Sequence, residues 1–397
     1  MAVLSLGHLC VDLCQGALPA LLPFLIAAHH WTYGQASALV LAATVCSSIV
    51  QPLFGHLSDG RSLPWLMPAG VAVAAIGISL AGVAGDYRLT FAVVVFSGLG
   101  VAAYHPEASR FANYVAGEKR ATAMSLFSVG GNAGLALGAA IVTPLALAFG
   151  LSGTPLVAVI PLAVAVLLVV ELPRLTSFRP VATTAGARSG DAPAEPDQWR
   201  PFVRLTLAIA ARSVVFFGLT TLVPLYFVGE LHTSKGTANA ALTVMLACGA
   251  IGTLIGGRLA DRFSRRVVLR TSLGVLTPLM VVMLSGGPGV AIVALAFIGA
   301  ATIATFSVTV VMGQEYLPGR LGVASGVTLG LSIGVGGIAA AGLGALADAT
   351  SLRTALEVLA VVPLPALALA LSLPEGRRPA GAQGSGRPRE ARPLTVG

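Results

Sequence analysis

Twelve long apolar runs, separated for the most part by short polar loops, dominate this chain of 397 residues. A run of roughly 20 apolar residues is long enough to cross a bilayer as an α-helix. Because lipid offers the backbone no hydrogen-bond partners, a continuous apolar run of this length crosses only as a helix. We therefore predict transmembrane helices at residues 2–28, 34–59, 64–84, 89–113, 120–149, 153–173, 202–229, 237–260, 267–285, 289–313, 320–347 and 352–373.

The composition indicates the same class of protein. Hydrophobic residues make up 56% of the chain and charged residues only 10%, whereas soluble domains carry about 25% charged residues. The mean hydropathy is +0.87. The net charge of +8 does not indicate a nucleic-acid partner, because the basic residues lie in loops and in the tail and are not interleaved with aromatic residues on one face.

The order of the runs predicts an all-α membrane protein of two six-helix bundles related by pseudo-two-fold symmetry. The first bundle covers residues 1–173 and the second covers residues 201–373. Residues 174–200 combine Pro, Ala, Ser, Gly and charged residues without an apolar face, so we expect a mobile linker. Residues 374–397 have a similar composition, and we expect a disordered tail there.

The basic residues predict how the chain is oriented. They gather in every second loop, in the linker and in the tail, whereas the opposite loops hold only Arg88, Lys235 and Arg353. Lys and Arg are enriched in loops that stay in the cytoplasm. We therefore expect both termini and the linker on the cytoplasmic side.

A loop motif is repeated in the two predicted bundles, at residues 257–266 and, more weakly, at residues 55–61. Its glycine lets helices approach closely, and its aspartate can pair with an arginine or face a helix N-terminus. Both copies resemble short inner loops of the major facilitator superfamily, although Gly60 stands where that family usually has an arginine. We predict a gating role for Gly55, Asp59, Arg61, Arg110, Gly257, Asp261, Arg262, Arg265 and Arg266.

The first apolar run carries His8, Asp12 and Gln15 at spacings of four and three residues, which places them on one helix face. Ionisable residues at membrane depth are rare and costly, so each is a functional candidate. A carboxylate there suits proton binding and release. The alternative is a structural aspartate paired with a neighbouring helix.

The fourth run carries His105 and Glu107 on either side of a proline that kinks the helix. A histidine and a carboxylate at one level suit a proton relay, and we predict proton coupling at Asp12, His105, Glu107 and His8. Glu107 can instead pair with Arg110 three residues later, and Arg110 can also reach Asp59.

Arg212 is the only basic residue well inside the spans of the second bundle. It would attract an anionic group of a substrate or pair with a carboxylate of the first bundle. Aromatic residues near it are more often packing than part of a substrate cage. The predicted substrate-binding residues are Gln15, Gln51, Tyr104, Ser128, Asn132, Arg212, Phe216 and Tyr226.

Residues 7–19, 51–55, 98–108 and 127–132 together resemble the fosmidomycin-resistance branch of the major facilitator superfamily. The resemblance implies a multi-pass protein of the bacterial cytoplasmic membrane that exports a small phosphonate antibiotic or another toxic compound by using the proton gradient. It implies protons, a small substrate and the lipid bilayer as partners, with no cofactor. We expect the chain to work as a monomer.

Other functions remain as alternatives. A proton-coupled uptake carrier for a sugar or an organic anion would share the fold, and the sequence does not set the direction of transport. An enzyme is not expected, because the serine motif at residues 150–153 lies in an outer turn and neither a zinc-protease motif nor a Walker A loop is present. Scattered charges without a ring argue against a channel.

Cys10 and Cys14 share a helix face near His8, which would also fit a metal ligand set. Two small thiols packed in an apolar core are the better interpretation, and we expect neither a metal site nor a disulfide.

Overall fold

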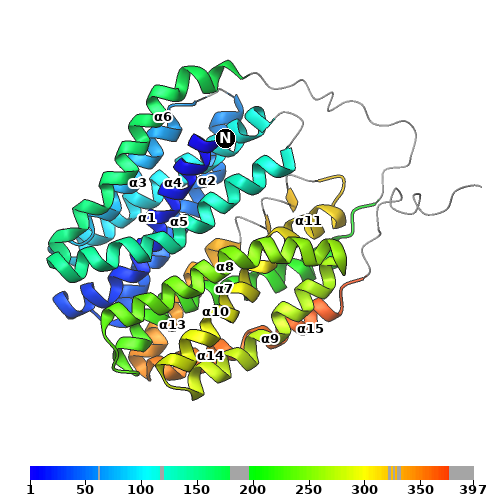
Figure 1. The fold of residues 1–397 in the computed structure, drawn as a ribbon. Helices are drawn as coiled ribbons and strands as arrows, with labels where there is room; N and C mark the ends of the chain where they lie inside the picture. Colours follow the sequence, from blue (N-terminus) through cyan, green and yellow to red (C-terminus); the bar gives the residue numbers. More distant parts are fainter. Residues whose placement is uncertain are drawn as a thin grey trace, which may run out of the picture.

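The computed structural model describes residues 1–60, 63–116, 120–178, 196–320, 323–324, 327–328 and 332–374 (Figure 1). The described residues form helices and connecting turns, with no β-strand among them. The first half contains α1 (Ala2–His29), α2 (Tyr33–Gly60), α3 (Leu66–Leu80), α4 (Tyr87–Ala116), α5 (Arg120–Phe149), the 3₁₀-helix η1 (Gly150–Ala158) and α6 (Val159–Ser177). The second half contains α7 (Trp199–Gly229), α8 (Lys235–Arg262), α9 (Arg265–Ser285), α10 (Pro288–Ala304), α11 (Phe306–Tyr316), α13 (Ser332–Ala349), α14 (Leu352–Val361) and α15 (Pro363–Leu371).

The prediction of an all-α membrane protein is confirmed. Among the described residues, eight helical stretches are long and apolar enough to cross a membrane, and two shorter apolar helices accompany them. Eleven of the predicted spans coincide with one helix or with two consecutive helices. Helix α13 covers residues 332–347 of the predicted span 320–347, and much of the rest of that span lies outside the described residues. The tenth span is interrupted at Thr305, and the last is interrupted before Pro363, which lacks the N–H that would continue α14. The number of twelve spans is consistent with this arrangement.

The packing of the helices repeats between the halves. In the first half α1 packs on α5, α2 on α4, and α3 on both α4 and α6. In the second half α7 packs on α13, α8 on α10, and α9 on both α10 and α15. The same set of partners recurs one half further along the chain, which is the pseudo-two-fold relation that the sequence predicts.

The two halves meet along two seams, α2 against α13 and α5 against α8. Figure 1 shows the half from α1 to α6, coloured blue through green, beside the half from α7 to α15, coloured green through red. Within the first half, glycines let α5 approach α1 closely: a Cβ added at Gly134 or Gly138 would collide with the α1 backbone. The glycine-rich sequence of the fifth span therefore serves tight packing here.

Hydrogen bonds between the halves gather at the end of the molecule where α1 and α7 finish. The Asp348 carboxylate at the end of α13 accepts bonds from the backbone N–H groups of Tyr33 (2.7 Å) and Gly34 (2.8 Å), so it caps the N-terminus of α2. Asn239 of α8 donates to the carbonyl oxygen of Ala20 and to Oγ1 of Thr143, both at 2.9 Å. We call the end of the molecule that these two groups of contacts hold together the closed end.

The predicted linker and tail lie mostly outside the description. Helix α6 continues to Ser177 and α7 begins at Trp199, a few residues inside the predicted linker boundaries. Residues 179–195 of the linker and residues 375–397 of the tail are outside the described residues.

Candidate functional site

Three titratable side chains meet inside the first half: His8 and Asp12 of α1 and His105 of α4. Nε2 of His8 lies 3.3 Å from one oxygen of Asp12, and Nε2 of His105 lies 3.4 Å from the other. The two Nε2 atoms are 3.2 Å apart. His8 and Asp12 are each only 9% exposed. We call these three residues the His–Asp cluster.

Backbone carbonyls fix both imidazoles from behind. Nδ1 of His8 lies 2.7 Å from the carbonyl oxygen of Phe127, and Nδ1 of His105 lies 2.9 Å from that of Val101. Because a carbonyl only accepts, each Nδ1 carries a proton and donates it. In two neutral imidazoles both Nε2 atoms would then be bare acceptors facing each other and a carboxylate. One further proton on either Nε2 supplies a donor to the other ring or to Asp12, and so removes part of that repulsion.

Helix α5 leaves room for the cluster because it has a glycine there. A Cβ added at Gly131 would stand 2.5 Å from both Asp12 Oδ2 and His8 Nε2. One turn earlier, the ring of Phe127 stacks on that of His8 with centroids 4.1 Å apart. The α5 sequence therefore holds the His8 ring in place and keeps the space beside it open.

The three ligand atoms of the cluster lie within 4.8 Å of one another, close enough to share a metal ion. Closed metal sites usually have four ligands, and no fourth His, Cys, Asp or Glu among the described residues joins the group. Each imidazole also faces a different oxygen of Asp12. This geometry suits a carboxylate that accepts a hydrogen bond from a proton-bearing Nε2 of either imidazole better than a shared metal.

Glu107 belongs to a separate arrangement. Its fully buried side chain pairs with Arg110 and accepts a hydrogen bond from the backbone N–H of Leu63 at 3.0 Å. The structure thus pairs Glu107 with Arg110, one of the two possibilities that the sequence leaves open, and does not bring it to His105. The contact with Leu63 ties the loop before α3 to α4.

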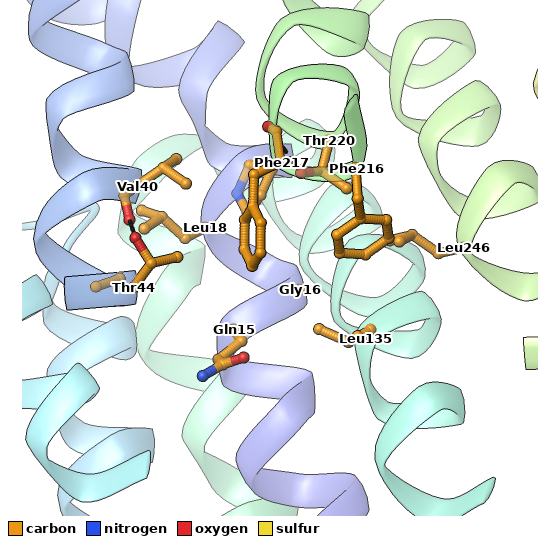
Figure 2. A pocket seen from close by; sticks show the side chains of 12 residues that line it. Gln15, Gly16, Leu18, Val40, Thr44, Leu135, Phe216, Phe217, Thr220 and Leu246 are labelled. Carbon is orange, nitrogen blue, oxygen red and sulfur yellow. Dashed lines mark hydrogen bonds between the residues drawn. The ribbon is translucent and has the colours of Figure 1, made fainter. Parts of the chain in front are cut away.

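A cavity of about 50 Å³ lies between the halves, lined by α1, α2 and α5 on one side and by α7 and α8 on the other. Its lining is mainly aliphatic and aromatic (Figure 2). The hydroxyls of Thr44 and Thr220 donate to the backbone of their own helices. The lining residues are Gln15, Gly16, Leu18, Pro19, Val40, Ala43, Thr44, Leu135, Phe216, Phe217, Thr220 and Leu246.

A smaller void of about 10 Å³ extends from this cavity into the first half. Both hollows share Gln15, Leu18 and Ala43. Val101, whose carbonyl holds His105, also lines the smaller void. The His–Asp cluster therefore lies next to the hollow interior, separated from the large cavity by about one turn of α1.

Arg212 of α7 is 6% exposed, and its Nε and Nη1 atoms have no hydrogen-bond partner among the described residues. Its guanidinium lies over the ring of Phe306, 5.5 Å from the ring centroid. Arg212, Phe216 and Thr220 follow one another at intervals of four residues, so they occupy one face of α7. The latter two line the cavity.

The other predicted binding residues are divided between the cavity and the packed interior. Gln15 and Phe216 line the cavity, and Asn132 donates to Thr253 of the other half at 3.3 Å. Tyr104 is buried and donates to the carbonyl oxygen of Leu4 at 2.6 Å, which ties α4 to α1. Tyr104, Asn132 and Arg212 do not line the cavity, and neither do half-buried Gln51, exposed Ser128 and buried Tyr226.

The predicted gating residues lie apart from the cavity. Arg265 pairs with Glu315 of α11, and Arg266 donates to the carbonyl oxygen of Leu373 at 3.4 Å. Asp261 and Arg262 are exposed, and a Cβ added at Gly257 would meet no atom within 4 Å. Arg61 lies outside the described residues, and Gly55 and Asp59 lie in the part of α2 whose burial and side-chain contacts are not described.

Sequence reasoning missed Gly131, Asn239 and Asp348. Asn239 carried a usable signal, because an amide inside the apolar run at residues 237–260 needs partners. Asp348 follows the last residue of a predicted span, where a polar residue is common, so its position gives no sign of a contact with the other half. Gly131 is one of many glycines in its run, and nothing local distinguishes it.

Comparison with known proteins supports the same picture. The model of the Major Facilitator Superfamily matches residues 4–341 and 205–396. The chain is 34% identical to "Uncharacterized MFS-type transporter YfnC" of Bacillus subtilis (strain 168), and 28% identical to "Fosmidomycin resistance protein" of Escherichia coli (strain K12). Each match spans 95% of this chain and 93% of the relative.

Solved structures share the fold at low sequence identity. A bacterial homologue of the human lysosomal transporter Spinster, in an inward-facing and occupied conformation, aligns with a TM-score of 0.76 and 16% identity. That match covers 93% of this chain and 95% of the other. A mutant of the nucleoside transporter NupG aligns with a TM-score of 0.71 and 14% identity, covering 94% of this chain and 98% of the other.

Proposed function

This chain belongs to the Major Facilitator Superfamily and is a transporter rather than an enzyme, and we propose that it exports a small antibiotic or another toxic compound in exchange for protons. A fosmidomycin-like phosphonate is the first substrate to test, because a full-length relative carries the name of that resistance. We propose that the chain acts as a monomer in the bacterial cytoplasmic membrane, with both termini in the cytoplasm.

The observation that carries the proton part of the proposal is the His–Asp cluster. Both Nδ1 atoms are engaged by carbonyls, so the cluster gains and loses protons only at the face shared by the two Nε2 atoms and Asp12. The cluster is buried, yet it adjoins the hollow interior. A proton held there changes the charge beside the cavity by one unit.

Coupling follows from alternating access of one cavity to the two sides of the membrane. The carrier changes conformation when either the substrate occupies the cavity or a proton occupies the cluster. Protons enter from the outside when substrate has left, and they leave into the cytoplasm before the next substrate binds. Gln15 is the polar residue between these sites, because it lines the cavity one turn from Asp12.

The repeated loops are the proposed gates of this cycle. Asp59 and Asp261 would hold helix ends together at the end opposite the closed end, when the cavity faces outward. Asp261 is exposed here and makes no hydrogen bond or ion pair with another described residue, which fits a latch that engages only in the other conformation. The Asp261→Asn variant should shift the conformational balance without removing substrate binding.

Proton-coupled uptake of an organic anion is the second candidate, and Arg212 favours it. An anion near Arg212 and a proton in the cluster offset each other's charge, which favours binding of both together. Joint binding drives substrate and proton in the same direction. Export instead requires that substrate and proton occupy the carrier in turn.

Everted membrane vesicles decide between these functions. In vesicles acidified inside, labelled fosmidomycin should accumulate within the lumen, and the accumulation should collapse when an uncoupler removes the proton gradient. A panel of toxic compounds, chosen from the susceptibility of cells with and without the protein, replaces fosmidomycin if it is not transported. Proton-driven loss of preloaded substrate from these vesicles would refute export and support uptake.

The Asp12→Asn variant tests the cluster. It should abolish gradient-driven accumulation while the protein remains folded in the membrane, because the amide no longer holds an exchangeable proton between the imidazoles. The Glu357→Gln variant is the matched control, since it makes the same change at an exposed carboxylate that pairs with Arg353. Normal gradient-driven transport by Asp12→Asn would refute the proton assignment.

A further inference from the structure

We infer that the second half binds the headgroup of an anionic phospholipid between α7, α9 and α15, at the end of the molecule opposite the closed end. This site lies away from the cavity and from the His–Asp cluster. The inference shares with the proposed function only the orientation of the chain in the membrane, and it is independent of the substrate and of the direction of transport.

Three arginines from α7 and α9 donate hydrogen bonds to four consecutive backbone carbonyls at the C-terminal end of α15, which packs against both helices (Figure 1). The contacts are Arg270 Nη2 to Leu371 (3.0 Å), Arg270 Nε to Ala370 (3.1 Å), Arg204 Nη1 to Ser372 (3.2 Å) and Arg266 Nη1 to Leu373 (3.4 Å). Because the four acceptors follow one another along the chain, the guanidiniums gather in one place. We call Arg204, Arg266 and Arg270 the arginine cluster.

The cluster carries more positive charge than the helix end offsets. The last carbonyls of a helix are together equivalent to roughly half a negative charge, and a single basic side chain can cap them. Arg204 and Arg270 are both permanently protonated, and neither pairs with a carboxylate among the described residues. Glu315 of α11 is already paired with Arg265. The surplus of positive charge calls for an anion from outside the chain.

Two members of the cluster keep donors for such an anion. Within the described part of the chain, Arg204 donates only from Nη1, and Arg270 donates only from Nε and Nη2. A guanidinium has five N–H donors, so several remain on each side chain. Arg204 is exposed and Arg270 is half-buried, which places the cluster at the surface of the molecule. Guanidiniums form strong, charge-assisted hydrogen bonds with phosphate oxygens.

The surroundings of the cluster favour a lipid over a soluble phosphate. Leu207 lies three residues from Arg204 on one face of α7, and Leu364 and Leu371 lie seven residues apart on one face of α15. All three leucines are exposed and belong to predicted membrane spans. A phospholipid can cover them with its acyl chains while its phosphate meets the arginines. Basic pockets between the cytoplasmic ends of transmembrane helices bind anionic headgroups in this way.

The C-terminal tail is not a suitable occupant. Residues 375–397 contain five arginines and two glutamates. The tail therefore adds positive charge to this end of the molecule and does not neutralise the cluster. An anionic headgroup is the complementary partner.

The first half forms the corresponding helix end without such a cluster. Helix α6, which packs on α3 as α15 packs on α9, has one basic residue in its last turn, Arg174. Arg174 has a carboxylate partner in Glu171, at 3.6 Å. The fold itself therefore does not require several arginines at this position, which argues that the cluster does more than cap a helix.

Native mass spectrometry of the purified full-length protein, titrated with lipid in detergent, tests this inference. The probes are dioleoyl phosphatidylglycerol and dioleoyl phosphatidylcholine, which have the same acyl chains but differ in net headgroup charge. We expect the first molecule of phosphatidylglycerol to bind at least tenfold more tightly than phosphatidylcholine. Equal affinities would overturn the inference without any variant.

A soluble competitor distinguishes a lipid from a free phosphate. Glycerol 1-phosphate carries the phosphate without acyl chains, so it should displace phosphatidylglycerol only weakly. Complete displacement at an equal concentration would assign the site to a soluble phosphate and overturn the lipid as its occupant.

Substitutions locate the headgroup. Arg204→Gln removes one exposed charge and one hydrogen bond, and it should lower the affinity for phosphatidylglycerol at least threefold. Arg204→Gln combined with Arg270→Gln should lower it at least tenfold, and neither protein should change its affinity for phosphatidylcholine. Arg270→Lys keeps a charge but loses the planar fork that caps α15, so it should bind phosphatidylglycerol more tightly than Arg270→Gln does. Equal losses in these two variants would assign Arg270 a capping role only and overturn the proposal.

Arg174→Gln and Arg353→Gln are the matched controls. Each removes the charge of an exposed arginine that already pairs with a glutamate, Glu171 or Glu357. Both proteins should bind phosphatidylglycerol like the unmodified protein. A loss equal to that of Arg204→Gln would show a general effect of net charge and overturn the assignment to the cluster.

Discussion

Replacing Asp348 with alanine should open the closed end of the molecule. The carboxylate sits on α13 in the second half, and the two N–H groups that it caps belong to α2 in the first half. Both hydrogen bonds therefore exist only while the halves meet at this end. Their full contribution enters the equilibrium between the closed and open conformations, rather than the stability of either half.

The expected size follows from the geometry. The two bonds are short, at 2.7 and 2.8 Å, and the carboxylate lies at the positive end of the α2 dipole. Loss of an N-terminal cap typically costs about 1 kcal/mol, and we keep to this value because Asp348 is exposed and screened by solvent. The open conformation should become roughly fivefold more populated relative to the closed one.

Spin-label distances measure this shift. Labels attached through Ala28→Cys and Ala240→Cys, two exposed positions near the closed end in different halves, should show more of the long-distance population after Asp348→Ala. Cys10, Cys14, Cys46 and Cys248 are first replaced so that only these positions react.

Asp86→Ala is the matched control. Asp86 caps α4 through the N–H of Leu89 at 3.0 Å, wholly inside the first half. Its loss should leave the distance distribution unchanged. An unaltered distribution in Asp348→Ala, or an equal shift in both variants, would refute the reasoning that the contact between the halves holds this end closed.

Three further predictions concern the first half and its contacts with α8. Gly131→Ala should abolish proton-driven transport, because the added methyl group would stand 2.5 Å from Asp12 and His8. Gly342→Ala in α13, where a methyl group meets nothing within 4 Å, should transport normally, and equal transport by both variants would contradict the cluster geometry. Glu107→Gln should lower the free energy of unfolding of the purified protein by several kcal/mol, because it breaks a buried ion pair. Proton coupling should remain. Loss of coupling in a well-folded Glu107→Gln protein would show that Glu107 belongs to the proton path. Asn239→Ala removes two buried hydrogen bonds between the halves, worth about 1 kcal/mol each. It should therefore increase the long-distance population more than Asp348→Ala does in the same spin-label measurement. A smaller increase would show that Asn239 stabilises one half only.

The sequence predicts the fold well because one requirement dominates it, namely that a backbone in lipid must form its hydrogen bonds within a helix. Apolar runs of bilayer length form helices wherever they stand, and the ends of α2 and α8 fall within two residues of the predicted limits. Helix interruptions were harder to see. The break at Thr305 follows no proline or glycine, and the 3₁₀ turn η1 replaces the first residues of the predicted sixth span.

The site was partly predictable, for a geometric reason. His8 and Asp12 are four residues apart, so any helix places them together. The position of His105 beside them depends on how α4 is rotated against α1, and the same rotation turns Glu107 away toward Arg110. The contact of Asp348 with the α2 backbone joins residues more than 300 positions apart, and backbone N–H groups have no side-chain signature that could reveal it.

The seams of α2 with α13 and of α5 with α8 hold the halves together through their own side chains and backbones. The halves therefore do not need a peptide link to stay together. Two separately translated fragments, one ending at Phe178 and the other beginning at Pro196, contain every partner of both seams. Such fragments should find each other in the bilayer and assemble as a working heterodimer. Each fragment alone would expose the unmatched flank of its inner helices to lipid.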